Sequence, residues 1–245
     1  MTSDNTVAQQ RAEKAAAAFA AQRKRDRQRN ARTGLAVVAV ILLIVGVGFL
    51  LNKLNDDSDD VTAAAAGGSE YGLVVGDAGA PHTIVIYEDF LCPICGILEN
   101  TASDRLAELA ADGQVQIDFR PIVILDRFGP YSEDAANAFF VVQDEAGSEV
   151  AKEFHDLLFE AQPSESGPFP DTDWLVEKAV EAGADEDAVR DGIEQGARAD
   201  VVQSATEDAI DAGVEGTPTV LLDGKPFRDG SSWEEIANNL VSAVE

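Results

Sequence analysis

The sequence predicts an α/β domain over residues 72–245, preceded by a single membrane-spanning helix. Three observations predict this arrangement. Short runs of β-branched and aromatic residues alternate with segments of helical spacing, which is typical of a small mixed sheet with helices on both faces. An uncharged stretch, Gly34–Leu51, is 18 residues long and can therefore cross a bilayer. The net charge also changes sign across this stretch.

The formal net charge of the 245 residues is −27, and it is unevenly distributed. The first 33 residues hold eight Lys and Arg against three Asp and Glu, whereas the rest hold 10 against 42. The acidic field of the larger part repels nucleic acid, and we interpret it as a solvated surface. A specific cationic partner is the alternative.

Gly34–Leu51 is interpreted as an uncleaved anchor. At about 1.5 Å of rise per residue, this helix would be about 27 Å long, close to the hydrocarbon thickness of a bilayer. A cleaved signal peptide would have a shorter apolar core with a small-residue site directly behind it, and a helix buried in the core is the third possibility.

The charges beside the span predict its orientation. Six Lys and Arg residues between Arg23 and Arg32 precede it, whereas one base, Lys53, and four aspartates follow it closely. The positive-inside rule therefore predicts a single-pass protein of the cell membrane, with residues 1–33 as a basic cytoplasmic tail and the rest extracytoplasmic. Residues 52–71 are acidic and then rich in Ala and Gly, which is typical of a flexible linker.

The first half of the domain is predicted to be a strand, a helix and a second strand. Thr83–Tyr87 is apolar on both faces, which suits a buried central strand. Cys92–Ala111 has helical spacing, and Asp112-Gly113 ends it. Val115–Ile124 returns to strand character, with Pro121 marking an edge or an exit from the sheet.

Residues 132–212 are predicted to be a helical insertion of about four helices, separated by glycines. Ser132, Asp171 and Asp185 each stand where an N-cap is expected, with acidic residues in the following turn.

A β-hairpin and a last helix are predicted to complete the domain. Thr219–Leu222 and Lys225–Arg228 flank Asp223-Gly224, a strong two-residue turn signal. Ser232-x-x-Glu235 is a capping box, and the helix that it begins is expected to run to Val244.

The two cysteines of the chain, Cys92 and Cys95, stand at the beginning of the first predicted helix. Positions i and i+3 of a helix lie about 5–6 Å apart, within the reach of a disulfide. A disulfide across so short a loop restricts the unfolded chain little and therefore stabilises the fold little. The pair thus suits a redox centre better than a structural disulfide. Unpaired N–H groups and the helix dipole favour a thiolate at Cys92, and Pro93 suits the first helical position.

Cysteine pairs of this spacing also occur in zinc sites and at points of haem attachment. A zinc site needs about two more ligands, and the chain has no other cysteine and only two isolated histidines, His82 and His155. Haem attachment needs a histidine after the second cysteine, where Gly96 stands. A structural disulfide stays open. No metal site and no other cofactor are therefore expected.

Two carboxylates, Glu88 and Asp89, directly precede the cysteines. They would raise the pKa of the Cys92 thiol if they faced it, or they could relay a proton for Cys95, or they could face solvent. The last interpretation is favoured.

A second motif, Gly213-Val-Glu-Gly-Thr-Pro-Thr219, stands immediately before the predicted hairpin. An X-Pro bond adopts the cis form at modest cost. A cis Thr217–Pro218 bond would turn the chain sharply and leave the backbone of Thr217 as an edge for an extended peptide. Taken alone, the motif is also compatible with an ordinary loop.

YEDFLCPIC at 87–95 followed by GVEGTPTVLLDGK at 213–225 resembles the thioredoxin superfamily, and more narrowly its DsbA-like thiol–disulfide oxidoreductases of bacterial envelopes. The resemblance extends from Gly72 to Glu245. It implies a thioredoxin-like fold with a helical insertion. It also implies that Cys92 is the exposed nucleophile and Cys95 the buried thiol that resolves the mixed disulfide.

The same resemblance implies roles for the neighbouring residues. Gly216, Thr217 and Pro218 would form the cis-proline loop that packs against the disulfide and binds substrate backbone. Pro93 and Ile94 would tune the redox potential. Relatives with a histidine between the cysteines can donate to the thiolate, and Ile94 cannot, so the oxidising strength stays open.

We therefore expect a membrane-tethered enzyme that oxidises cysteines of exported proteins by dithiol–disulfide exchange. A quinone-linked membrane thiol oxidase is expected to reoxidise the Cys92–Cys95 pair, and the chain is expected to be a monomer that does not bind nucleic acid. Two alternatives stay open: an extracytoplasmic disulfide reductase or isomerase, and a non-catalytic membrane-anchored binding module with a structural disulfide.

Overall fold

Residue 61 and residues 67–245 are described by the computed structural model. The expected cytoplasmic tail at 1–33, the expected span at 34–51 and most of the expected linker at 52–71 lie outside the described residues. Within the part of the chain that is described, no helix is both long and apolar enough to span a bilayer.

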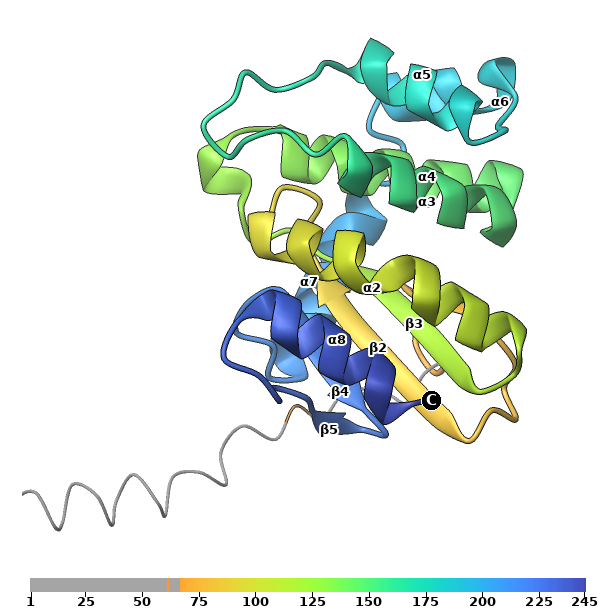
Figure 1. Ribbon diagram of the computed structural model, residues 1–245. Coiled ribbons are helices and arrows are strands. Elements are labelled where there is room, and N and C mark those ends of the chain that lie inside the picture. Colours follow the sequence, from red (N-terminus) through yellow and green to blue (C-terminus); the bar gives the residue numbers. More distant parts are fainter. Residues whose placement is uncertain (1–60, 62–66) are drawn as a thin grey trace, which may run out of the picture. The chain divides into compact units, whose positions relative to one another are not determined.

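A five-stranded sheet in the order β1-β3-β2-β4-β5 lies at the centre of the domain (Figure 1). Strands β2 and β3 are parallel, and the other neighbouring pairs are antiparallel. The five strands are β1 (Leu73–Val75), β2 (His82–Glu88), β3 (Val115–Pro121), β4 (Thr219–Leu222) and β5 (Lys225–Pro226).

Strand β2 is the central strand that the run of apolar residues predicts. Ile84 and Ile86 point into the main core, while Val85 and Tyr87 belong to a second apolar cluster on the other face of the sheet. Because both faces are covered, the strand can be apolar throughout. Helix α2 (Pro93–Ala111) then connects β2 to the parallel strand β3, so the predicted strand, helix and strand are confirmed.

Strand β3 ends at Pro121, three residues earlier than predicted, and its alternate residues are polar although all of them are buried. Arg120 Nη2 lies 2.8 Å from Asp118 Oδ2, and Arg120 Nη1 donates to Tyr87 Oη at 2.8 Å. These bonds compensate for the burial of a charged pair. Strand β1 was not predicted, because three residues are too few for a periodic pattern and pairing with β3 stabilises them.

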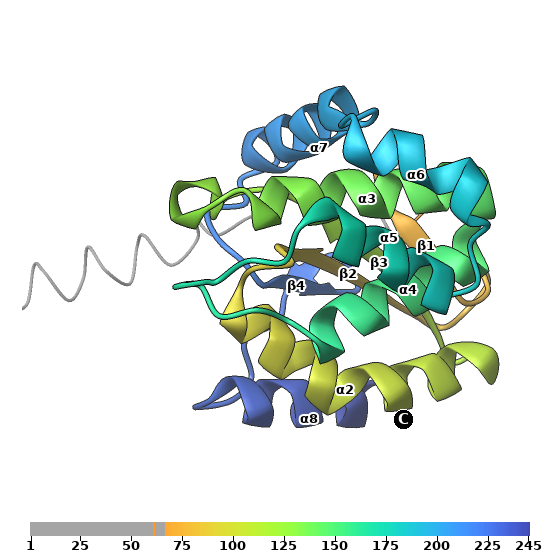
Figure 2. The same ribbon diagram turned by 90° about the horizontal axis from the view of Figure 1, so that it is seen from above.

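Helices cover both faces of the sheet (Figure 2). Helices α2 and α8 (Trp233–Ala243) lie on one face, and α7 (Ala199–Asp211) lies on the other. The remaining helices form a block above the sheet in Figure 1: α3 (Tyr131–Ala146), α4 (Ser148–Glu160), α5 (Thr172–Glu181) and α6 (Glu186–Glu194).

The helical insertion contains five helices, α3 to α7, where about four were predicted. Asp171 and Asp185 are N-caps as predicted, because their side chains accept from Trp174 N and Asp187 N. The prediction for Ser132 is wrong. Pro130 is the N-cap of α3, and the Ser132 hydroxyl instead donates to a buried carboxylate of another segment.

The hairpin and the last helix are confirmed. Asp223 and Gly224 have φ angles of 51° and 77°, as a tight turn between antiparallel strands requires. Strand β5 ends at Pro226, two residues before the predicted end, although Phe227 N still donates to Val220 O of β4 at 2.8 Å. Ser232 Oγ accepts from Glu235 N at 3.2 Å and caps α8.

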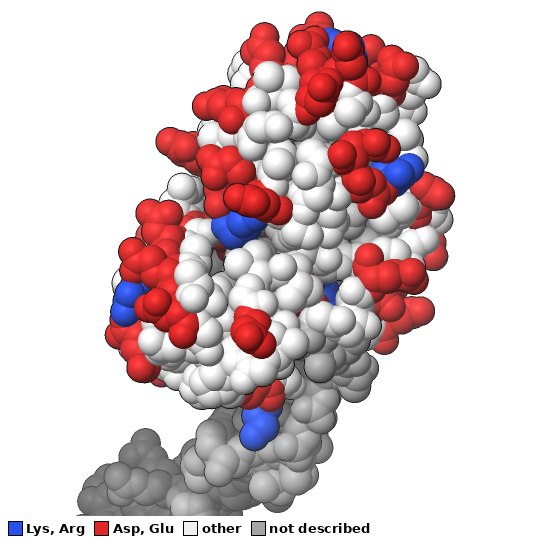
Figure 3. All heavy atoms as spheres, turned by 90° about the vertical axis from the view of Figure 1, so that its right-hand side faces the viewer, with Lys and Arg blue, Asp and Glu red and all other residues white. Residues whose placement is uncertain are grey.

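The surface of the domain is acidic. On the face in Figure 3, Asp and Glu side chains lie in several groups separated by uncharged surface, and Lys and Arg are few. This distribution agrees with the interpretation of the acidic excess as solvated surface.

Candidate active site

Cys92 stands at the junction of strand and helix where the sequence places it. It is the N-cap of α2 with φ −73° and ψ 114°, and Pro93 occupies the beginning of the helix. Both cysteines are free thiols. Cys92 is 5% exposed and Cys95 is fully buried. The expectation of an exposed Cys92 is therefore wrong for the reduced protein, in which the thiol is bonded to the Thr217 carbonyl, although Cys92 still borders a groove.

The loop before β4 brings residues from far along the chain to the thiols. Strand β4 pairs with β2, and this register places Thr219 opposite Tyr87. The Thr217–Pro218 peptide bond is cis, as expected. The Cys92 thiol donates to the Thr217 carbonyl at 3.4 Å. The Thr217 hydroxyl is also buried; it makes no hydrogen bond to a described residue while Cys92 is a thiol, and it can donate to the sulfur once Cys92 is a thiolate.

The two thiols differ strongly in acidity. The hydrogen bond from Cys95 lowers the pKa of Cys92 most; burial opposes it, and Thr217 and nearby backbone N–H groups lower it further, to about 6. Burial, together with the hydrogen bond and charge of Cys92, raises the pKa of Cys95 well above its ordinary value. The result is one thiolate at the helix end and one protonated thiol behind it.

The expectation that Glu88 and Asp89 face solvent is wrong, since both are fully buried. The carboxylate of Asp89 accepts hydrogen bonds from four donors, because the chain folds back around it. The donors are Leu91 N at 2.9 Å, Ile124 N at 2.9 Å, Leu125 N at 3.1 Å and Ser132 Oγ at 2.6 Å. Asp89 therefore ties the loop before the cysteines to the segment after β3 and to α3.

Gln162, in the loop after α4, is a site residue that sequence reasoning missed. Its amide nitrogen donates to the carbonyls of Phe90 and Cys92, both at 2.9 Å. A side chain at Gly96 would bring its Cβ within 2.4 Å of Gln162 Oε1. A glutamine in a loop carries no sequence signal, so only the fold identifies Gln162 as a residue that positions Cys92.

A groove of about 450 Å³ borders Cys92 and brings together most of the predicted site residues. Cys95 and Pro218 do not line it. Its lining is formed by the CxxC turn, the segment after β3, the loop after α4 and the proline loop: Cys92, Pro93, Ile94, Ile124, Leu125, Arg127, Glu165, Glu215, Gly216 and Thr217. A client thiol that enters this groove meets Cys92 before it meets Cys95.

A sheet of this order, a CxxC at the beginning of α2 and a cis-proline beside it define a thiol–disulfide oxidoreductase site. A family profile described as thioredoxin matches residues 68–241. The chain belongs to the thioredoxin family, among its DsbA-like thiol–disulfide oxidoreductases.

Solved structures of this class are similar to the chain. The reduced disulfide bond oxidoreductase DsbG of Mycobacterium tuberculosis is 32% identical with a TM-score of 0.60, over 71% of this chain and 85% of that one. DsbA of the same organism, in its oxidised form, is 29% identical with a TM-score of 0.57, over 71% of this chain and 100% of that one. MdbA of Corynebacterium diphtheriae, at 23% identity with a TM-score of 0.62 over 78% of this chain and 98% of that one, shares the fold.

Two larger proteins, a kinase and an antiporter, are similar to this chain over only part of their own length. The serine/threonine-protein kinase PknE of Mycobacterium tuberculosis is 27% identical over 158 residues, which are 61% of this chain and 28% of the kinase. The Na(+)/H(+) antiporter NhaA 3 of Salinispora tropica is 29% identical over 172 residues, which are 69% of this chain and 24% of the antiporter. The chain therefore spans about a quarter of these relatives.

In the reduced protein, Cys92 is expected to ionise with a midpoint near pH 6, whereas its ordinary pKa is 9.0. Because this pKa is lower in the folded state, the reduced protein gains stability as the pH rises from about 6 to 9, by at most about 4 kcal/mol, and loses it as the pH falls through 6. Thiolate absorbance in the far ultraviolet measures the midpoint, and unfolding at several pH values measures the stability. The oxidised protein is the control, and a midpoint near 9 in the reduced protein would contradict the prediction.

Proposed function

We propose that this oxidoreductase acts as an oxidase, which passes its Cys92–Cys95 disulfide to cysteines of exported proteins. The observation that supports this direction best is the contrast in acidity between the two thiols. A stable Cys92 thiolate favours the reduced enzyme, and each unit of pKa lowering makes the disulfide a stronger oxidant by about 1.4 kcal/mol. Hydrogen bonds from Cys95, Thr217 and the backbone supply the lowering, without a histidine at position 94.

The proposed reaction consists of two exchanges. A client thiolate attacks the Cys92 sulfur of the oxidised enzyme, the bond between the two cysteines breaks, and Cys95 leaves and takes up a proton. A second client thiolate then attacks the client sulfur of the mixed disulfide, and Cys92 leaves as a thiolate. The client loses two electrons and gains a disulfide, and the enzyme gains both electrons. Low pKa makes Cys92 the better leaving group in the second step.

The position of the proline loop supports an extended segment of the client protein as the substrate. Gly216 and Thr217 line the groove beside Cys92, where an extended peptide can pair with exposed backbone. In this proposal Pro93 and Ile94, which line the same groove, tune the redox potential, and Pro218 holds the loop behind it.

An extracytoplasmic site is part of the proposal. The apolar run at 34–51 and the bases before it support a membrane tether, which would hold the enzyme beside emerging exported chains. A quinone-linked thiol oxidase of the membrane would then reoxidise the pair.

The Cys95→Ser variant tests the proposal. This variant cannot form the Cys92–Cys95 disulfide, but its Cys92 thiolate can attack the disulfide of an exported protein, which is the reverse of the second exchange. Without Cys95 to attack the Cys92 sulfur in turn, the mixed disulfide is expected to accumulate, so exported proteins should be recovered covalently bound and released by reductant. A Cys92→Ser/Cys95→Ser variant is the control and should capture none.

The resting redox state of the wild-type pair decides the direction. Alkylation in whole cells with a thiol reagent that adds mass should find mostly disulfide. A pair that is mostly dithiol would overturn the oxidase direction, and a Cys95→Ser variant that captures nothing would overturn the exchange itself.

A further inference from the structure

Three side chains with metal-ligating atoms meet beside the thiol site. Glu88 is the last residue of β2, Glu99 lies on α2 and His155 lies on α4. Their ligand atoms all lie within 4.8 Å of one another. The residues are 0%, 5% and 0% exposed, respectively. Two carboxylates buried together are unfavourable unless protons or a cation compensate for their charge.

Two oxygens of this cluster have no partner. Glu88 Oε1 lies 2.6 Å from His155 Nε2. Glu88 Oε2 and Glu99 Oε2 are buried and make no hydrogen bond to any described residue. Buried polar atoms are nearly always paired, so two unpaired carboxylate oxygens within one cluster point to a ligand.

The surroundings hold His155 in the orientation that a ligand needs. Its Nδ1 lies 2.9 Å from Asp156 Oδ1, which leaves Nε2 turned toward the carboxylates. A carboxylate that accepts from the second ring nitrogen is the usual support of a metal-binding histidine. The rings of Phe119 and Phe159 pack on the imidazole at 4.7 Å and 5.0 Å between centroids and restrict its rotation.

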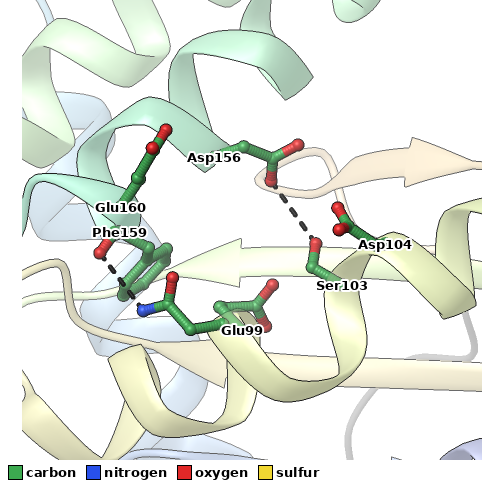
Figure 4. A pocket seen from close by; sticks show the side chains of 7 residues that line it. Glu99, Ser103, Asp104, Asp156, Phe159 and Glu160 are labelled. Atoms are coloured by element: carbon green, nitrogen blue, oxygen red, sulfur yellow. Dashed lines mark hydrogen bonds between the residues drawn. The ribbon is translucent and has the colours of Figure 1, made fainter.

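A pocket of about 320 Å³ gives access to this cluster between α2 and α4 (Figure 4). Glu99 belongs to both the cluster and the pocket lining. Asp104, Asp156 and Glu160 also line the pocket, and Lys152 compensates for one of these charges through its ion pair with Asp156. The remaining acidic charge attracts cations, and the pocket is large enough for water that completes a coordination shell.

We propose that Glu88, Glu99 and His155 bind a divalent transition-metal ion of the zinc type, with water from the pocket as a further ligand. The imidazole nitrogen favours zinc over calcium and magnesium, which prefer oxygen ligands alone. Two carboxylates neutralise the charge of the ion. On binding, His155 Nε2 gives up its proton and its hydrogen bond to Glu88, while Nδ1 continues to donate to Asp156.

Zinc binding to the full-length protein tests this proposal. The protein is used in its oxidised form, because free thiols at Cys92 and Cys95 would themselves bind zinc. Calorimetry with zinc chloride should find one tightly bound ion per chain, and excess calcium should not displace it. The melting temperature should rise when zinc is added.

The Glu99→Gln variant removes one ligand while keeping the shape of the side chain. Its affinity for zinc should fall by about a hundredfold or more. Glu108→Gln, the same change at an exposed position of the same helix, is the matched control and should bind like the wild type. Equal affinity in both variants, or no stoichiometric zinc in the wild type, would overturn the proposal.

X-ray absorption spectroscopy of the zinc-loaded wild type identifies the ligand atoms directly. This measurement needs no variant, so it does not depend on whether the variants fold. The spectrum should show imidazole nitrogen and oxygen around zinc and no sulfur. A spectrum with oxygen ligands alone would assign the ion to surface carboxylates and overturn the site. Because the thiols are oxidised throughout, this outcome is separate from the outcome for disulfide exchange.

Discussion

The Cys92→Ser variant is expected to exchange disulfides more than about a thousandfold more slowly than the wild type. A serine hydroxyl neither ionises near neutral pH nor forms a disulfide, so both steps of the reaction lose their reacting atom. The rate at which each protein, after treatment with an oxidant, converts a reduced two-cysteine peptide to its disulfide measures the effect.

The Cys95→Ser variant separates the roles of the two thiols. Cys95 is fully buried and its pKa is raised, whereas Cys92 borders the groove and its pKa is lowered. Cys95→Ser should therefore still form a mixed disulfide with an activated client, and Cys92→Ser should not. Mixed-disulfide formation by Cys92→Ser, or exchange within tenfold of the wild type, would show that Cys95 is the attacking thiol or that the reaction lies elsewhere.

The Asp89→Ala variant is expected to lower the free energy of unfolding by roughly 3–6 kcal/mol. Four donors lose their acceptor: the N–H groups of Leu91, Ile124 and Leu125 and the hydroxyl of Ser132. Buried donors without a partner carry their full desolvation cost. Denaturant unfolding of the oxidised proteins measures the difference.

Asp112→Ala is the matched control for this prediction. Asp112 is exposed at the end of α2, so its loss should change the stability by less than about 0.5 kcal/mol. An Asp89→Ala protein within about 1 kcal/mol of the wild type would mean that water replaces the carboxylate. Because Ile124 and Leu125 line the groove, the same variant should also exchange disulfides more slowly.

Much of the fold could be predicted because its signals are local. The apolar run of β2, the Asp223-Gly224 turn and the side-chain caps Asp171 and Asp185 each stabilise the segment in which they stand. Strand β1 could not be predicted, because its three residues are held by pairing with β3, about 40 residues further along the chain.

The residues of the site also fall into those that local sequence predicts and those that it does not. The spacing of Cys92 and Cys95 and their place at a helix start are properties of one short segment. The burial of Glu88 and Asp89 was mispredicted, because a carboxylate is placed inside only when donors from distant segments reach it. Gln162 has no local signal, since its amide acts on carbonyls 70 and 72 residues away.

By itself, the sequence determined the class of this protein: a paired thiol at the beginning of a helix and a proline before a hairpin, each defined by neighbours along the chain. Tertiary structure decided which carboxylates are buried, which histidine meets Glu88, and which contacts lower the pKa of the thiol that the sequence already predicts to ionise. The physical reason is that pKa and burial depend on the atoms that surround a group in space, and packing brings these atoms from β2, α2, α4 and the loop before β4.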